Sequence, residues 1–171
     1  MAGVTTPQFV AASANAGILG AIGAGYLSGE ETRVFIREVK KLTNMPFMVN
    51  LFVPEEIKVD GEMIQKAVAD LAPIRQVLGI SEREVDFSQS SFHEQIDVII
   101  AEGVKFCSFT FGLPDVAVIQ RLKEEDIYLI GTATTKTEAL LAERIGMDAV
   151  VVQGSEAGGH RGSFDGKLTL I

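Results

Sequence analysis

Short apolar runs alternate along this chain with longer segments of helical period, and this alternation constrains the fold more than any other feature. The runs are rich in β-branched residues and are mostly followed by Gly, Asn or Thr, whereas the longer segments repeat apolar residues every three or four positions. Such βα repetition predicts parallel strands, in chain order, with helices packed on the sheet. We expect strands over 18–22, 47–52, 105–109, 128–130 and 149–152, and helices over 7–16, 28–42, 61–78, 92–101, 115–124 and 136–144.

Chain length and the two chain ends predict an α/β fold of the (β/α)₈ TIM-barrel type that is incomplete. Such a barrel typically needs about 250 residues, whereas this chain has 171. The opening Met1-Ala2-Gly3 resembles the end of a strand whose body is absent. We therefore expect residues 1–171 to form a single partial barrel domain that lacks the first strand and the last two βα units. A polar stretch before Ser91 is expected to be a surface excursion.

Charge and cysteine content exclude several kinds of partner. The formal net charge is −8 and basic residues are scattered among acidic ones, so the sequence has no basic stripe to neutralise nucleic-acid phosphates. One cysteine, Cys107, and two histidines provide neither a disulfide nor a zinc cluster. The apolar opening segment has no basic start and no long uninterrupted apolar run. We expect a cytoplasmic protein without metal, nucleic acid or membrane contact, and homo-oligomerisation stays open.

Functional residues of a parallel βα fold are expected where the strands end, because loops at their carboxyl ends carry the active site. Glycines there permit close backbone approach to a flat ligand, and amide or hydroxyl side chains supply donors and acceptors. The sequence therefore predicts a site for a planar ring cofactor. The residues at these positions include Ala2, Gly3, Gly23, Asn50, Thr132, Gln153 and the loop 154–162.

Several of these positions also allow a purely structural interpretation. Gly23-Ala24-Gly25 fits a tight turn, and its spacing is not that of a dinucleotide-binding loop. Asn50 interrupts an apolar strand and must hydrogen-bond either to a ligand or to the backbone. His160 follows paired glycines that would deliver its imidazole to the barrel mouth, and the alternative is an ordinary surface histidine. Cys107 lies within a strand and is expected to be buried as a small hydrophobic residue.

The segments Met1–Pro7, Ser13–Gly20, Pro46–Pro54, Gly131–Thr134 and Gly146–Gly162 together carry a family resemblance. The longest contains Gln153-Gly-Ser-Glu-Ala-Gly-Gly-His160 and is long enough to be specific. In these segments the chain resembles the nitronate monooxygenases, formerly called 2-nitropropane dioxygenases, which are FMN-dependent barrel enzymes. The resemblance implies oxidation of alkyl nitronates, and in addition neutral nitroalkanes, with dioxygen taking the electrons and a carbonyl compound and nitrite released.

The same resemblance implies residue roles by motif position. His160 would be the catalytic base, because a neutral nitroalkane must lose its α-proton and an imidazole exchanges protons near neutral pH. Gly23, Thr132 and Ser155 are expected on the substrate side of the site. The residues expected to contact FMN are Ala2, Gly3, Asn50, Gln153, Gly158 and Gly159.

Two other hypotheses account for the same residues. FMN-dependent enoyl-acyl carrier protein reductases also resemble the chain through a Glu-Ala-Gly-Gly-His loop, although Val4–Pro7 and Asn50–Pro54 look more like the nitronate group. The other hypothesis is a non-catalytic fragment of such a barrel, since an open parallel sheet exposes unpaired edges that promote association.

Overall fold

The chain is described by a computed structural model, which covers residues 2–55, 60–81 and 91–165. Its strands are β1 (Gly20–Gly23), β2 (Phe47–Phe52), β3 (Phe106–Thr110), β4 (Tyr128–Ala133) and β5 (Ala149–Val152). Its helices are α1 (Pro7–Asn15), α2 (Gly29–Leu42), α3 (Gly61–Leu78), α4 (Phe92–Ala101), α5 (Val116–Glu124) and α6 (Lys136–Arg144).

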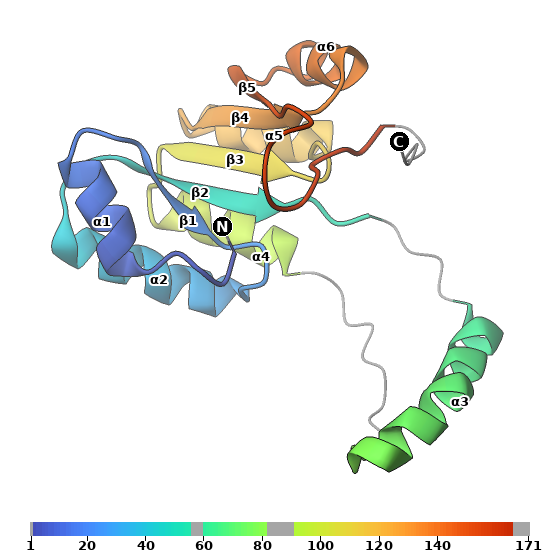
Figure 1. Cartoon of the computed structure of the whole chain (residues 1–171). Helices are drawn as coiled ribbons and strands as arrows, with labels where there is room; N and C mark the ends of the chain where they lie inside the picture. The colour runs from blue at the N-terminus through green and yellow to red at the C-terminus, as the bar shows by residue number, and fades with distance from the viewer. Residues whose placement is uncertain (1, 56–59, 82–90, 166–171) are drawn as a thin grey trace. The chain divides into compact units, whose positions relative to one another are not determined.

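The five strands form one sheet in the order β1-β2-β3-β4-β5 (Figure 1). Each neighbouring pair is parallel, so the prediction of parallel strands in chain order is confirmed. This arrangement brings the carboxyl ends of all five strands to one edge of the sheet, although residues of β1 and β5 are more than a hundred positions apart in the chain.

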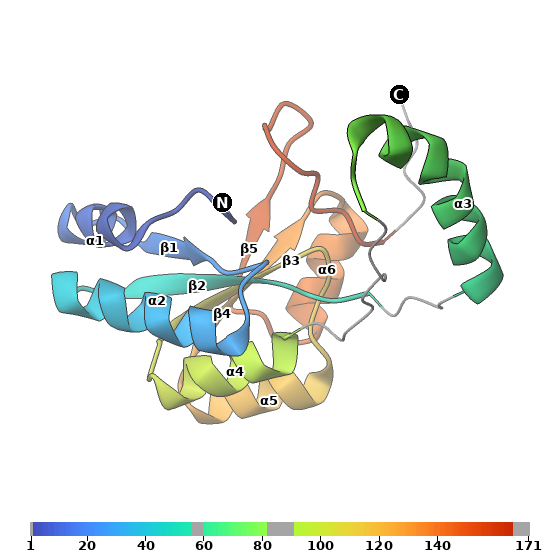
Figure 2. The same cartoon turned by 90° about the horizontal axis from the view of Figure 1, so that it is seen from below.

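Apart from α3, which belongs to a separate compact unit, the helices pack against this sheet. α2, α4 and α5 lie side by side along one face (Figure 2), α1 contacts α2 and β1, and α6 contacts β4 and β5. Local sequence explains where several helices begin. The hydroxyl of Ser28 accepts from the Glu31 backbone while the Glu31 carboxylate accepts from Ser28, and Thr135 and Glu138 repeat this capping box at α6.

Burial alternates along the strands and separates two faces of the sheet. In β2 the odd-numbered residues are buried, whereas the even-numbered residues are half-buried. Because successive side chains of a strand point to opposite faces, the odd-numbered residues belong to the helix-covered core. Asn50 lies on the other side, which we call the inner face, and the register places Gly23 and Ser108 beside it.

Observed boundaries agree with the expected ones except at a few strand ends. β1 begins at Gly20, because Gly20 is the first residue that pairs with β2, whereas Ile18 and Leu19 are exposed. β4 continues past Ile130 to Ala133 because its last residues pair with β5. Cys107 is fully buried in β3, as expected, and burial raises the pKa of its thiol.

The chain separates into two compact units, one made of Met1–Pro54 with Ser90–Ile171 and the other of Glu55–Gln89. In the second unit, α3 is capped by Asp60 at its start and by Gly79, with φ 64°, at its end. The polar excursion expected before Ser91 lies largely outside the described residues. No helix in the described part of the chain is long and apolar enough to cross a membrane. A single domain over the whole chain stays a prediction.

Candidate functional site

The inner face carries a hydrogen-bonded polar cluster near the carboxyl ends of β2 and β3. The Nδ2 atom of Asn50 donates to the hydroxyl of Ser108 at 2.9 Å and to that of Thr110 at 3.1 Å. Asn50 therefore has protein partners on the neighbouring strand, mainly side-chain hydroxyls. Its side chain is held in one orientation before any ligand arrives.

Gln153, directly after β5, fastens the loop that contains the family segment. Its Nε2 donates to the backbone oxygen of His160 at 2.9 Å, and its Oε1 accepts from the backbone N–H of Gly162 at 2.7 Å. Gly162 is buried, and a Cβ at this position would come within 3.0 Å of the Thr132 methyl carbon. The Gln153 amide thus positions the backbone of His160 and of Gly162, and Gly162 packs against Thr132 near the end of β4.

A second fastening comes from Glu138 on α6, which is fully buried. One carboxylate oxygen accepts from the backbone and hydroxyl of Thr134 and the backbone of Thr135, at 2.6–3.1 Å. The other accepts from residues 163–165 at 2.7–3.0 Å. The carboxylate therefore joins the loop after β4 to the segment after β5, which are 25 or more residues apart in the chain.

This bonding keeps Glu138 ionised. Burial by itself raises the pKa of the carboxyl group, but the backbone N–H groups of residues 164–165 and Thr134 outweigh burial and lower the pKa to about 2. Hydrogen bonds to the charged form of a carboxylate have this effect in general. Sequence reasoning missed Glu138. The capping-box pattern Thr135-x-x-Glu138 marks it as a helix cap, but nothing local in the sequence signals its bonds to residues 163–165.

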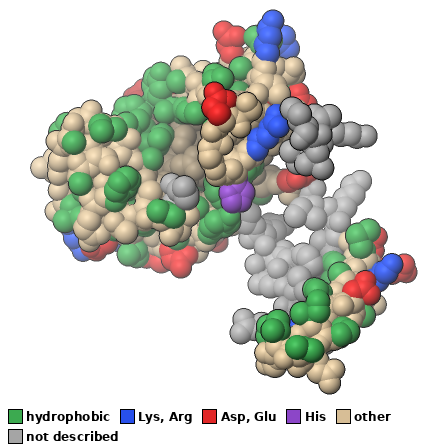
Figure 3. All heavy atoms as spheres, in the orientation of Figure 1, with side chains coloured by type: hydrophobic (Ala, Val, Ile, Leu, Met, Phe, Trp, Pro, Cys, Tyr) green, Lys and Arg blue, Asp and Glu red, His purple; other side chains and the backbone are tan. Residues whose placement is uncertain are grey.

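His160 lies at the end of an aromatic row formed by Tyr26, Phe52 and Phe111. Ring centroids are 5.3 Å apart between Tyr26 and Phe52, 4.7 Å between Phe52 and Phe111, and 6.0 Å between Phe111 and the imidazole. These residues follow or end β1, β2 and β3, so the row runs along the carboxyl edge of the sheet. The face shown in Figure 3 presents a histidine at the surface with hydrophobic side chains nearby. Sequence analysis did not identify this row.

Two backbone features shape the row. A Cβ at Gly25 would lie only 2.3 Å from the Phe52 ring, so the glycine is needed for this ring to pack against the turn after β1. Phe111 has a φ of 67°, a left-handed conformation that is uncommon and costly for a bulky residue. Such a conformation persists only where the surrounding structure enforces it. Residues of this kind are found mainly at active sites, ligand-binding sites and switch regions.

The first half of the loop after β5 is more open than the second. Gly158, Gly159 and Ser155 are exposed, and a Cβ at either glycine would meet no atom within 4 Å. The loop borders a hollow of about 290 Å³. The residues that line it are Thr134, Gln153, Gly154, Ser155, Ala157, Gly159 and Arg161.

The expected residues near the chain start also reach this edge of the sheet. Ala2 and Gly3 lie in a turn, Gly3 with a φ of 74°. The hydroxyl of Thr5 then accepts from the backbone N–H of Gly23 at 3.1 Å, which ties the opening segment to the end of β1. Gly23 in turn pairs with Asn50.

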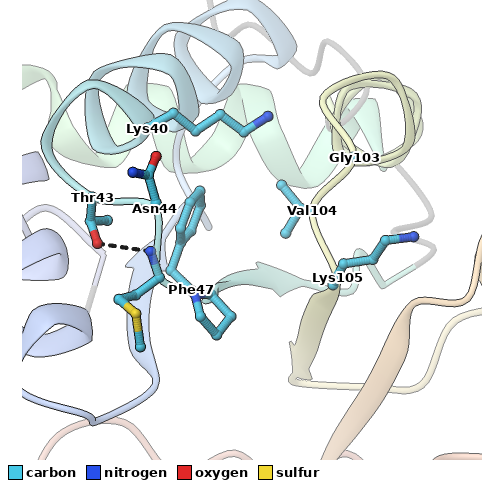
Figure 4. A pocket seen from close by; sticks show the side chains of 9 residues that line it. Lys40, Thr43, Asn44, Phe47, Gly103, Val104 and Lys105 are labelled. Carbon is cyan, nitrogen blue, oxygen red and sulfur yellow. Dashed lines mark hydrogen bonds between the residues drawn. The ribbon is translucent and has the colours of Figure 1, made fainter.

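A second hollow, of about 340 Å³, lies at the opposite edge, where the strands begin (Figure 4). Its two lysines are engaged by backbone oxygens: Lys40 donates to Glu102, and Lys105 donates to Glu125 at 2.8 Å. The residues lining this hollow are Lys40, Thr43, Asn44, Met45, Pro46, Phe47, Gly103, Val104 and Lys105.

In the described part of the chain, no group of three or more His, Cys, Asp or Glu is placed to hold a metal ion.

The family model "Nitronate monooxygenase" matches residues 1–171. The chain belongs to the nitronate monooxygenase family. It is 47% identical over 165 residues to a probable nitronate monooxygenase of Staphylococcus saprophyticus subsp. saprophyticus, covering 96% of this chain and 46% of the relative. A probable nitronate monooxygenase of Staphylococcus aureus (strain JH9) is 48% identical over the same length and with the same coverage. The chain thus spans about half the length of these relatives.

Solved structures place this family member in the barrel fold. A nitroalkane oxidase from Streptomyces ansochromogenes superposes with a TM-score of 0.86 at 34% identity, covering 98% of this chain and 48% of that one. FabK from Thermotoga maritima gives a TM-score of 0.70 at 28% identity, with coverages of 95% and 41%. The prediction of a partial (β/α)₈ barrel is confirmed.

Proposed function

We propose that the full-length protein uses FMN and dioxygen to oxidise alkyl nitronates, and neutral nitroalkanes as well, releasing a carbonyl compound and nitrite. The observation that carries the proposal is His160, whose backbone Gln153 holds at the carboxyl edge of the sheet, in a chain that the nitronate monooxygenase family model matches over residues 1–171. The likeness to nitroalkane oxidase supports a nitro compound as the substrate.

The residues at this edge are suited to hold a flavin ring. Open space at Gly158 and Gly159 leaves their backbone accessible to a flat ligand, and the Asn50 amide is oriented on the inner face. When bound, FMN would supply the redox chemistry, through which two electrons of the substrate pass to dioxygen. The residues proposed to hold it are Ala2, Gly3, Asn50, Gln153, Gly158 and Gly159, with Gly23, Thr132 and Ser155 on the substrate side.

His160 contributes proton transfer. A neutral nitroalkane has a proton on the carbon next to the nitro group, and removal of that proton leaves its electron pair on the nitronate. The imidazole takes the proton, while Gln153 fixes the backbone of His160 and the Phe111 ring lies 6.0 Å from the imidazole. A nitronate has already lost this proton, so its oxidation requires positioning but no base.

Purification of the full-length protein tests the proposal directly. We expect a yellow protein with FMN absorbance, which consumes oxygen and forms nitrite when an alkyl nitronate is added. A colourless protein that takes up no added FMN would contradict the cofactor assignment. FMN binding without nitrite formation would contradict the reaction.

An FMN-dependent enoyl-acyl carrier protein reductase is the second candidate, and the structural likeness to FabK favours keeping it. This reaction consumes a reduced pyridine nucleotide in the presence of an enoyl thioester. Loss of nucleotide absorbance with that substrate, and no nitrite from nitronates, would select the reductase. A non-catalytic fragment is the third candidate, and the intact mass of the protein purified from its native source distinguishes it.

A further inference from the structure

We propose that Tyr26, Phe52 and Phe111 form an apolar wall that binds the alkyl chain of the substrate, with Phe111 nearest the reacting carbon. This inference rests on the proposed function. The proposed chemistry involves the nitro group and the carbon beside it, and the inference says which residues bind the alkyl chain. The substrate class that fits is an unbranched aliphatic nitro compound long enough to lie along the row.

The geometry of proton transfer brings the alkyl chain to the row. A base must approach the proton it removes to about 3 Å between heavy atoms. The carbon next to the nitro group must therefore touch the imidazole of His160, and the following carbons lie a few ångströms further away. The Phe111 ring is centred 6.0 Å from the imidazole, so these carbons would lie against the ring.

The row then continues away from His160 along the carboxyl edge of the sheet. Phe52 lies 4.7 Å beyond Phe111, and Tyr26, which is 72% exposed, lies 5.3 Å beyond Phe52. Aromatic rings offer a chain large apolar area at little conformational cost. Longer chains would therefore reach Phe111, Phe52 and Tyr26 in that order, and each ring would affect a different part of the substrate.

Core packing alone does not account for this row. A left-handed backbone is costly for a bulky residue such as Phe111 and persists only where the surrounding structure enforces it, which is common at functional sites. Gly25 is also explained, because the backbone of the turn after β1 packs directly on the Phe52 ring. The backbone is thus constrained at both Gly25 and Phe111, and Phe111 lies beside His160.

The test compares unbranched alkyl nitronates of increasing length in the full-length, FMN-loaded protein. A methylene placed against one apolar surface is expected to raise kcat/KM about twofold, and a fully buried one about fourfold. Phe111→Gly removes the ring and suits the positive φ of this position, so the variant should fold. Its kcat/KM should lose the gain from the carbons that lie beside Phe111, while the gain from carbons that reach Phe52 and Tyr26 stays, and the shortest substrate should change less than about twofold.

Two further variants make the test position-specific. Phe52→Leu should reduce the gain only for chains that extend beyond Phe111, and Tyr26→Ala only for the longest ones. Phe9→Ala, which removes an exposed ring on α1 away from the row, is the matched control and should retain the full chain-length dependence. A second readout uses unreactive alkyl carboxylates, whose Kd values from calorimetry should follow the same pattern.

An unchanged chain-length dependence in Phe111→Gly would overturn the inference, and so would a loss of FMN content with that dependence intact, because the ring would then hold the cofactor. Failure of the proposed function is recognised separately. In that case the wild-type protein forms no nitrite from any nitronate, whereas the carboxylate titrations still show whether the wall binds alkyl chains.

Discussion

The two edges of the sheet are built from the same βα units, but their polar groups differ in how far they are engaged by neighbouring elements or exposed to solvent. Where the strands begin, charged side chains are joined to neighbouring elements: Glu102 accepts from Arg33 on α2 at 3.1 Å, and Asp148 accepts from the Leu129 backbone at 2.7 Å. Where the strands end, Gln153 fastens a loop that presents exposed glycines and His160 to solvent.

This difference follows from the direction of the strands. Loops after the carboxyl ends lead from the sheet into the helices, and each can change without disturbing the core, whereas the opposite edge mainly stabilises the fold. In this chain the edge where the strands end, at which we propose the site, also needs internal anchors, because a glycine-rich loop has high conformational entropy. Glu138 is such an anchor, a buried carboxylate that accepts hydrogen bonds from the loop after β4 and from the segment after β5.

The largest effect is expected from His160→Ala in the full-length protein. Turnover of a neutral nitroalkane should fall about 10²–10⁴-fold, because a general base contributes about that much, whereas nitronate turnover and FMN content change little. Steady-state rates with both substrates measure this, and His93→Ala is the control on an exposed histidine. Equal slowing of both substrates would show that His160 positions the substrate and removes no proton.

Glu138→Ala should be the most destabilising change at the edge where the strands end. It leaves the donors of Thr134 and of residues 163–165, most of them half-buried, without their acceptor, and an orphaned donor costs up to about 1–3 kcal/mol when it is buried. We expect the free energy of unfolding to fall by about 3–5 kcal/mol in urea titrations. Glu143→Ala, an exposed position on the same helix, should stay within about 0.5 kcal/mol. Similar losses in the two variants would argue against an anchoring role.

Acid should weaken the same anchor by a smaller amount. The folded-state pKa of Glu138 is lowered to about 2 from its ordinary 4.5, so its stabilisation is fully present above pH 4.5 and is lost as pH falls toward 2. Between pH 7 and pH 3 this group should account for about 2 kcal/mol of lost stability. Glu138→Gln has no carboxyl group to protonate at this position. Its free energy of unfolding should therefore fall by about 2 kcal/mol less than that of the wild type between pH 7 and pH 3. Parallel acid profiles for the two proteins would refute this assignment.

The smallest effect is expected at the edge where the strands begin. Lys105→Met removes one surface hydrogen bond to the Glu125 backbone, worth about 0.5–1.5 kcal/mol at most. Turnover and FMN content of the full-length protein should stay unchanged, as measured beside the wild type. A tenfold loss of turnover would mean that the hollow in Figure 4 takes part in function, and the contrast between the two edges would fail.

Local patterns were sufficient to predict much of the fold and part of the site. The boundaries of β2, β5 and α6 follow from apolar runs and from capping residues within a few positions of each end. The end of β4 was predicted too early, because its last residues are strands only through pairing with β5. The roles predicted for Asn50 and Gln153 as cofactor contacts stay predictions, and the structure adds the protein partners that orient both amides.

The sequence by itself determined the parallel βα order, and it predicts the edge at which the chemistry should lie and the segment that carries His160. Each of these depends on residues close together in the chain, through periodicity, caps and strand ends. Only the tertiary structure decided that Glu138 anchors residues 163–165 and that three separate strand ends assemble the aromatic row. Those contacts join segments many residues apart. They form because parallel strands bring distant carboxyl ends to one edge, and no local pattern encodes which side chains will meet there.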